Sequence, residues 1–507
     1  MTPQVENGGD SLGEKTLHSL GWTALDRWGT RIFSLITFTI LGRLLDASDF
    51  GLIALGTAFI ALSNILTDSG LSTSLVQRDE LTEEHINAAF FMNLGLSLGA
   101  MLVLCASSPL IARLFDTPAL QNVVIVQSFA ILLAAFTETP AALLERDFKF
   151  KALALRRIVG GSISGTCAVI LALSGFGVWS LVAQPIIFGV ISIATLWAST
   201  PWRPSFRISR ESVRELWGVG SNILGLKVVT FVSMQGDQFL VGAVAGNTAL
   251  GYYYFATRII TLASEMLSTV FSMVSLTVFS RLQNDRERLL SWLYRFVSGS
   301  SIVSIPIFFM AAATAPVFIP LVFGNQWEPA VRLIQILSLL GSINSIAYFD
   351  RSALLGSGHG RAALWMVIGQ MCLGLTLVAI AVQFSVTWVA IAIVARQYLY
   401  WPVRLAVLRS RLGVQPMEYV KRLAIPFVSA GIAVAPIFLI DFDPSASFIE
   451  SVAYLMLSVV ASGLIYLALL RLLARAQLDD ISNVVMSIPR LSPLFTRLHL
   501  RKAVEPA

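Results

Sequence analysis

Four charged residues lie inside the apolar stretch 216–281: Lys227, Asp237, Arg258 and Glu265. A charge at the centre of a bilayer costs ~2.5–3.5 kcal/mol on insertion scales, so such residues are usually paired or face a polar path. These residue types therefore permit two kinds of chemistry. They form structural ion pairs, or they line a path along which a polar ligand crosses the membrane, and both interpretations stay open.

The stretch divides into two arms, 216–246 and 251–281, joined by a short turn. Each arm is longer than the ~20 apolar residues that span a bilayer, so the arms predict an antiparallel transmembrane hairpin. Lys227 and Glu265 each lie nineteen residues from Gly246 and should sit at similar depth. Asp237 and Arg258 form a second level nearer the turn. The predicted ion pairs are Lys227 with Glu265 and Asp237 with Arg258.

A second group of charges, Asp26, Arg27 and Arg31, lies in the first apolar run of the chain. Arg27 and Arg31 are one helical turn apart, so they share a face of the predicted helix. They are candidate cations of the same polar path. The alternative is that both side chains extend to the cytoplasmic interface.

Further polar residues inside apolar runs extend the candidate cavity. A role in packing helices against one another is the alternative for each of them. They are Asn64, Asp68, Asn222, Gln235 and Gln238.

The composition is that of a polytopic membrane protein. Of the 507 residues, 56% are hydrophobic and only 13% are charged, against roughly 25% charged in soluble proteins. The mean hydropathy is +0.75. Apolar runs of spanning length predict an all-α fold of fourteen transmembrane helices. The predicted organisation is a cytoplasmic N-terminal tail (1–16), an N-lobe of helices one to six (17–200), a basic cytoplasmic linker (201–215), a C-lobe of helices seven to twelve (216–410), helices thirteen and fourteen (411–475), and a cytoplasmic tail (476–507).

Basic residues gather in alternate connections between the predicted spans. The connections after the fourth, sixth, eighth and twelfth spans are rich in Arg and Lys, and the intervening connections hold few. Since basic connections stay on the cytoplasmic side, both chain termini are predicted to be cytoplasmic. Membrane orientation thus accounts for the net charge of +6, and we expect no nucleic-acid partner.

An internal repeat relates the two halves of the chain. The stretch 41–51 parallels 241–251, with glycines at 42 and 51 in one and at 242 and 251 in the other. Helices one to six and seven to twelve therefore predict a duplicated six-helix unit, with a substrate site expected between the copies. In this register Arg27 falls opposite Lys227. Two glycine pairs, Gly95 with Gly99 and Gly161 with Gly165, have the spacing typical of close helix contacts.

Enzymatic chemistry has little support in the residue pattern. The four histidines are scattered without metal-ligand spacing, no Gly-rich phosphate loop ends in Lys-Ser or Lys-Thr, and every predicted outward connection is short. We therefore expect no catalytic residues, no metal site, no cofactor and no enzyme activity.

Several short stretches together resemble the polysaccharide transporter family of the MOP flippase superfamily, and within it the Wzx-type lipopolysaccharide and exopolysaccharide exporters. The stretches are 49–51, 68–78, 148–155 and 177–184 in the first half and 237–242, 251–253, 280–283 and 323–331 in the second.

The resemblance implies a MATE-like fold of two six-helix lobes plus two C-terminal helices, in a bacterial cytoplasmic membrane. It implies a flippase that moves a polyprenyl-diphosphate-linked oligosaccharide by alternating access, beside a polysaccharide polymerase or glycosyltransferase. Arg27, Arg31, Lys227 and Arg258 would bind the diphosphate or glycan, since arginine binds phosphate bidentately. The carboxylates of Asp26, Asp237 and Glu265 would balance these charges or couple transport to protons. A MATE-type drug or cation antiporter and a lipid II flippase share the fold and are the alternatives.

Overall fold

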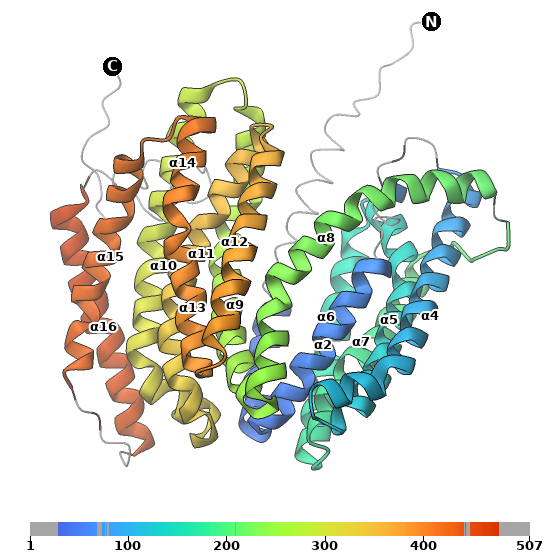
Figure 1. Ribbon diagram of the computed structural model, residues 1–507, viewed down its shortest axis with the longest axis horizontal. Coiled ribbons are helices and arrows are strands. Elements are labelled where there is room, and N and C mark those ends of the chain that lie inside the picture. Colours follow the sequence, from blue (N-terminus) through green and yellow to red (C-terminus); the bar gives the residue numbers. More distant parts are fainter. Residues whose placement is uncertain are drawn as a thin grey trace, which may run out of the picture. The chain divides into compact units, whose positions relative to one another are not determined.

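The computed structural model describes residues 29–67, 74–76, 78, 81–207, 209–440, 442 and 447–475, with the backbone alone at 210–214, 216–226, 268–274, 276–277 and 345. Within these ranges the regular structure is entirely helical (Figure 1). Eleven helices among the described residues are long and apolar enough to cross a membrane. The chain divides into two compact units, each considered by itself.

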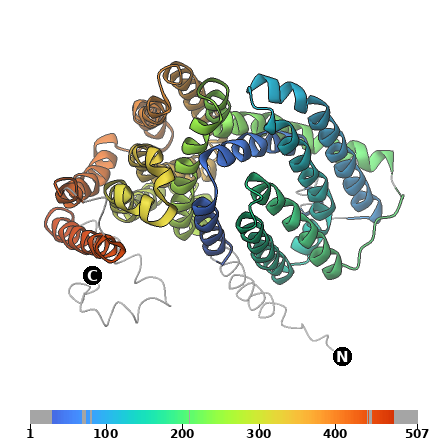
Figure 2. The ribbon, with the colours of Figure 1, turned by 90° about the horizontal axis from the view of Figure 1, so that it is seen from below.

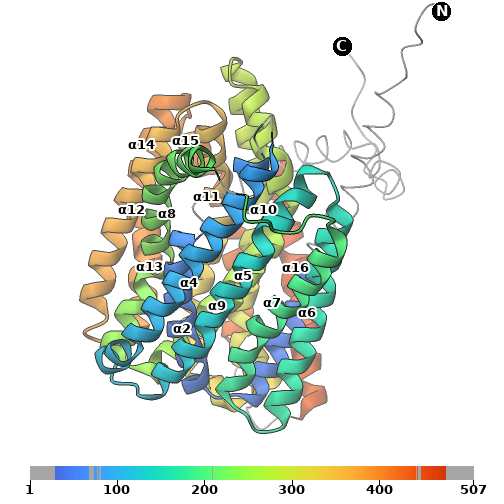
Figure 3. The same cartoon turned by 90° about the vertical axis from the view of Figure 1, so that its right-hand side faces the viewer.

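The first unit comprises Met1–Phe255, Val322–Ala330 and Met371–Val389. In the first repeat, α4, α5, α7 and α6 lie side by side in that order (Figure 3). The helices of this unit are a first helix at 29–44, α2 (Ala47–Thr67), α4 (Glu83–Leu114), α5 (Ala119–Arg146), α6 (Phe150–Leu173), α7 (Val178–Ser199), α8 (Arg210–Ala245), the start of α9 (Asn247–Arg281) and the short η1 (Asn325–Trp327).

Very short turns separate consecutive helices at one end of this unit. Gly246 alone separates α8 from α9, and its φ of +84° is a left-handed conformation that other residues rarely adopt. The predicted hairpin of α8 and α9 therefore turns within one residue. Large side chains fill the space around this turn, and Phe50, Tyr253, Phe255 and Trp327 are fully buried.

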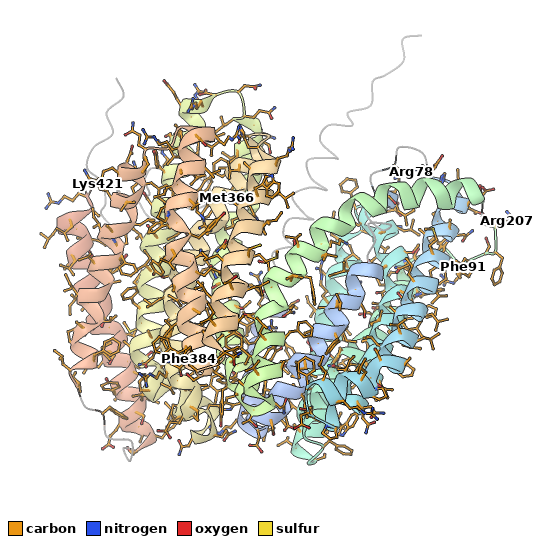
Figure 4. The ribbon with its side chains drawn as sticks, viewed as in Figure 1. Arg78, Phe91, Arg207, Met366, Phe384 and Lys421 are labelled. Carbon is orange, nitrogen blue, oxygen red and sulfur yellow. The ribbon has the colours of Figure 1, made fainter. Side chains whose placement is uncertain are left out.

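At the other end, the connection between the repeats is fastened to α4. We call residues 200–207 the strap. Asn87 of α4 donates from Nδ2 to Ser205 Oγ (2.7 Å), and its Oδ1 accepts from the Ser205 backbone N–H (3.1 Å). Phe206 stacks on Phe91 with ring centroids 5.0 Å apart. Figure 4 shows Phe91 and Arg207 near this end of α4. A buried amide with both of its groups satisfied fixes the strap to the first repeat.

The start of α8 is fastened close by. Glu215 accepts a hydrogen bond from Arg78 and lies 3.5 Å from His85 Nε2. The bond from the Arg78 guanidinium, followed by its charge, lowers the pKa of the Glu215 carboxyl. The strap and the start of α8 are therefore each tied to the first repeat, one before and one after residue 208.

The second unit comprises Ala256–Leu321, Val331–Gln370 and Ala390–Ala507. In it α15 and α16 pack against each other (Figures 1 and 2). Its core includes Phe279, Phe296 and Phe349. Besides the greater part of α9, its helices are α10 (Arg286–Phe323), α11 (Glu328–Gly356), the first half of α12 (Gly360–Ala381), most of α13 (Val386–Leu399), α14 (Trp401–Leu412), α15 (Pro416–Phe438) and α16 (Phe448–Leu473). The second half of α12 and the start of α13 belong to the first unit.

A buried polar group attaches α15 to this unit. Tyr419 Oη donates to Asp350 Oδ1 (2.8 Å), and Arg404 Nη1 lies 3.9 Å from Asp350 Oδ2. All three side chains are buried. Removal of one partner would leave a buried charge or hydrogen-bond donor unpaired. This group therefore holds α11, α14 and α15 in one specific arrangement.

The observed helices agree with the sequence-based expectations in outline. Each of the fourteen predicted runs overlaps a helix, while the number that cross the bilayer stays a prediction. The last predicted helix of the C-lobe, expected at 386–402, divides at Tyr400 into α13 and α14, because α14 begins with Pro402 in its first turn. The close contacts predicted at Gly95, Gly99 and Gly161 are wrong: an added Cβ there would meet nothing within 4 Å in the described part of the chain.

Candidate functional site

Helix α8 carries four of the predicted site residues in the first unit. Lys227, Gln235, Asp237 and Gln238 are all partly buried. The side-chain oxygen of Gln235 is buried without a hydrogen-bond partner among the described residues. A buried acceptor of this kind calls for a donor from water or from a bound ligand.

Asp237 is held by two hydrogen bonds. Tyr253 Oη of α9 donates to Asp237 Oδ2, and the Gln238 backbone N–H donates to Oδ1 at 2.9 Å. Tyr253 is only 1% exposed, so its hydroxyl needs an internal partner. Sequence reasoning missed Tyr253. Its signal was position: Asp237 and Tyr253 lie nearly equally far from Gly246, on opposite arms of the hairpin.

The predicted pairs of the hairpin stay predictions. Lys227 and Asp237 belong to the first unit, whereas Arg258 and Glu265 belong to the second. Both Arg258 and Glu265 are partly buried within α9.

Other predicted site residues are placed unevenly. Arg31 lies on the first helix and is partly buried, and Asn64 of α2 is exposed. Asn222 lies on α8, where only the backbone is described. Asp26, Arg27 and Asp68 fall outside the described residues.

A cluster that the charge pattern did not reveal lies around the helix ends at 42–51 and 242–251. We call it the glycine junction. An added Cβ at Gly51 would fall within 3.0 Å of the Asn247 backbone oxygen, and one at Gly251 would fall within 3.0 Å of the Ala47 backbone oxygen. Since 47 and 247, like 51 and 251, are equivalent in the repeat, the two contacts are reciprocal. Only glycine lets the two backbones approach so closely.

The other glycine pair makes a second reciprocal contact in the junction. An added Cβ at Gly42 would lie 2.8 Å from Phe323 Cδ1, and one at Gly242 would lie 2.9 Å from Leu55 Cδ2 and 3.3 Å from Phe115 Cε1. Aromatic rings fill the surrounding space, with Phe255 stacked on Trp327 at 3.6 Å. The junction therefore closes one end of the first unit through closely packed helix ends from both repeats.

Three of the eight stretches that carry the family resemblance meet in this junction. Residues 49–51, 251–253 and 323–331 all contribute to it. Their motif residues thus act through packing and backbone contacts. The charged residues of α8 lie further along the same helix, away from the turn at Gly246.

Comparison with known proteins places this architecture among polysaccharide biosynthesis proteins. The sequence profile of a family described as "Polysaccharide biosynthesis protein" matches residues 40–332. The chain is 25% identical to the succinoglycan biosynthesis transport protein ExoT of Rhizobium meliloti, over 73% of each chain. It is 23% identical to the lipopolysaccharide biosynthesis protein WzxC of Escherichia coli, over 66% of this chain and 69% of that protein. It is also 23% identical to the teichuronic acid biosynthesis protein TuaB of Bacillus subtilis, over 91% and 96%.

Solved structures show the same fold. The lipid II flippase MurJ in an inward closed conformation has a TM-score of 0.73 at 14% identity, covering 90% of this chain and 99% of that one. An inward-facing MATE multidrug resistance transporter of the MOP superfamily has a TM-score of 0.58 at 15% identity, covering 76% and 94%. At such identities the likeness concerns the fold alone. The predicted all-helical, MATE-like membrane fold is confirmed, and the chain is a multi-pass membrane protein.

Proposed function

We propose, because this chain belongs to the polysaccharide biosynthesis protein family, that it is a flippase for a polyprenyl-diphosphate-linked oligosaccharide. Family membership over residues 40–332 is the observation that carries the proposal. The predicted resemblance to polysaccharide exporters is confirmed by that membership and by the similarity to ExoT, WzxC and TuaB. The proposed cargo is the lipid-linked repeat of a lipopolysaccharide or exopolysaccharide.

The cations inside the helices are the proposed diphosphate ligands. Arg27 and Arg31 of the first repeat and Lys227 and Arg258 of the second would bind the phosphate oxygens while the lipid tail stays in the bilayer. A diphosphate cannot cross hydrocarbon unaccompanied, because desolvating its charge is too costly. Partial burial of Arg31, Lys227 and Arg258 supports this role, since a partly buried cation is poorly screened.

The carboxylates would balance these cations in the empty state. Asp26, Asp237 and Glu265 are the candidates, and Asp237 is already fixed by Tyr253. A carboxylate held in this way is suited to a static counter-charge, since its position does not depend on cargo. The unpartnered oxygen of Gln235 offers an acceptor for a sugar hydroxyl.

The proposed cycle is alternating access between two lobes, 17–200 and 216–410, with 411–475 as additional helices. We place both termini in the cytoplasm of a bacterial cell and the chain in its cytoplasmic membrane. Cargo would then leave the inner leaflet for the outer one, where a polymerase consumes it. The chain itself would act without a cofactor and without covalent chemistry.

A lipid II flippase is the second candidate, favoured by the TM-score of 0.73 to MurJ. A fold shared at 14% identity does not select the cargo, however. A MATE-type drug or cation antiporter is a weaker candidate, since a cation cavity should hold excess carboxylates and the candidate charges here are balanced or slightly cationic.

The test is reconstitution into liposomes with a fluorescent polyprenyl-diphosphate oligosaccharide, scoring the fraction that becomes accessible on the opposite leaflet. Wild-type protein should transfer the oligosaccharide, and Arg31→Ala should slow the transfer. Arg113→Ala, an exposed arginine at the end of α4, is the matched control and should not.

Each outcome separates the candidates. Transfer of fluorescent lipid II but not of the oligosaccharide would select the second candidate. Normal transfer by Arg31→Ala would remove that residue from the site. Transfer of neither lipid by folded, correctly oriented protein would overturn the proposal.

A further inference from the structure

The C-terminal end of the first helix is closed by side chains from the second repeat. Helix 29–44 ends with carbonyl groups that have no partner inside the helix. Trp327 Nε1 donates to Gly42 O at 2.6 Å. Gln326 Nε2 lies 3.2 Å from Arg43 O and 3.5 Å from Leu45 O. These donors come from the tip 322–330, which joins α10 to α11.

The tip and the end of the first helix each donate hydrogen bonds to the other. Arg43 Nη1 donates back to Val322 O at 3.2 Å. Trp327 is fully buried, and its indole lies against Phe255 on one side and meets the edge of Phe50 with centroids 5.1 Å apart. A buried indole N–H needs an acceptor, and the Gly42 carbonyl provides it. Trp327 is thereby fixed both by packing and by its hydrogen bond.

On the other side of the glycine junction, the positions equivalent to Gln326 and Trp327 carry no side-chain donor. The corresponding tip of the first repeat brings Phe115 against Gly242, as Phe323 lies against Gly42. Counted from these two phenylalanines, Pro118 and Ala119 occupy the places of Gln326 and Trp327. Neither proline nor alanine has a side-chain donor. The glycine contacts of the junction are therefore symmetric, whereas the tip of the second repeat carries side-chain donors that the first repeat lacks at positions 118 and 119.

The chain path shows what this fastening connects. The chain leaves the second unit at Leu321, forms the tip within the first unit, and returns to the second unit at Val331. The first helix carries Arg31, and about 16 Å of regular helix separates that residue from Gly42 at 1.5 Å per residue. A hydrogen-bonded helix of this length moves as one rod, so a displacement of the tip displaces Arg31.

We propose that Gln326 and Trp327 are positioning residues that set the place of the Arg31-bearing helix and couple it to the tip of the second repeat. This role rests on the proposed function, in which Arg31 binds the diphosphate. Closing of the site around the cargo would then be passed between the first helix and the tip of the second repeat.

The test uses substitutions that remove the donors and keep the packing. Trp327→Phe keeps an aromatic ring against Phe255 but has no N–H. Gln326→Ala removes the amide donor. Gln326→Lys keeps a donor of similar reach and should therefore restore the behaviour of the wild type. Trp388→Phe is the matched control, since Trp388 lies in the same unit and is 54% exposed.

Two readouts separate positioning from a merely structural role. The first is the dependence of liposome transfer on substrate concentration. The second needs no substrate: the distance distribution between spin labels at Asp46 and Glu328, both exposed, in a background without native cysteines. The double variant Trp327→Phe, Gln326→Ala should raise the apparent KM about tenfold, because a small misplacement of a binding group weakens binding strongly. It should also broaden the distribution of distances between the two spin labels. Protein yield and the control should be unaffected.

The two proposals fail in different ways. If wild-type protein transfers no oligosaccharide, the proposed function fails, and the distances alone still decide whether the tip is fastened. Distances that stay narrow in the double variant would overturn the fastening. Broadened distances with an unchanged KM would overturn the positioning of Arg31. A fall in maximal rate alone, without rescue by Gln326→Lys, would also overturn it.

Discussion

Replacing Gly251 with alanine should destabilise the glycine junction more than any ordinary surface substitution. An added Cβ would fall within 3.0 Å of the Ala47 backbone oxygen, a separation that real Cβ atoms essentially never show. The obstacle is a carbonyl of α2 rather than the end of a flexible side chain. The start of α2 and the start of α9 would therefore have to move apart.

The magnitude follows from two contributions. Overpacking of a close contact costs about 1–3 kcal/mol. Separation of the helix starts also weakens the 2.7 Å hydrogen bond from Asn247 Nδ2 to Ser48 O, whose net contribution is about 0.5–1.5 kcal/mol. We expect a loss of about 2–4 kcal/mol, which corresponds to a fall in Tm of roughly 2–4 °C for a chain of 507 residues.

The assay is thermal unfolding of purified protein in detergent. Gly99→Ala in α4 is the matched control, because an added Cβ there meets nothing within 4 Å. That change should be neutral or stabilise by up to about 1 kcal/mol, since alanine favours the helix. Equal Tm values for Gly251→Ala and wild type would refute the close contact of the two backbones.

Two further predictions concern single hydrogen bonds. Tyr253→Phe removes the phenol that donates to Asp237 and should lower the free energy of unfolding by about 1–3 kcal/mol, measured in the same assay; an unchanged value would mean that the bond contributes nothing. The Arg78 guanidinium lowers the pKa of the Glu215 carboxyl in the folded state. The Arg78–Glu215 pair therefore stabilises the folded protein above the unfolded pKa of about 4.3, and this stabilisation is lost as the pH falls through the folded pKa. Glu215→Gln should therefore unfold at a lower temperature than wild type at neutral pH and approach wild type in acid, and a difference independent of pH would contradict the assignment.

The repeat was the most productive feature of the sequence. The matching glycines at 42 and 242, and at 51 and 251, predicted equivalent positions in two halves, and the structure gives each pair equivalent contacts. Glycine is informative here because a backbone contact leaves no room for a side chain. GxxxG spacing was misleading at Gly95 and Gly99, because spacing puts both glycines on one helix face without saying what that face meets.

The candidate site was less predictable. Depth along a hairpin follows from counting residues, and the count put Asp237 at one level with Arg258. Counting does not tell which side chain faces which, so the phenol was missed. The bonds from Gln326 and Trp327 to the first helix join residues more than 280 positions apart. Such contacts depend on the tertiary arrangement, and nothing in the local pattern around 322–330 indicates them.

The connection between the two repeats is fastened to the first repeat at two separate places. On one side of residue 208, Asn87 binds Ser205, and on the other side Arg78 binds Glu215. Both anchors belong to the first repeat, so the chain on each side of residue 208 has a contact of its own with that repeat. A chain nicked between the two anchors would keep both new ends in place, and a gene split there could still yield a working pair of polypeptides.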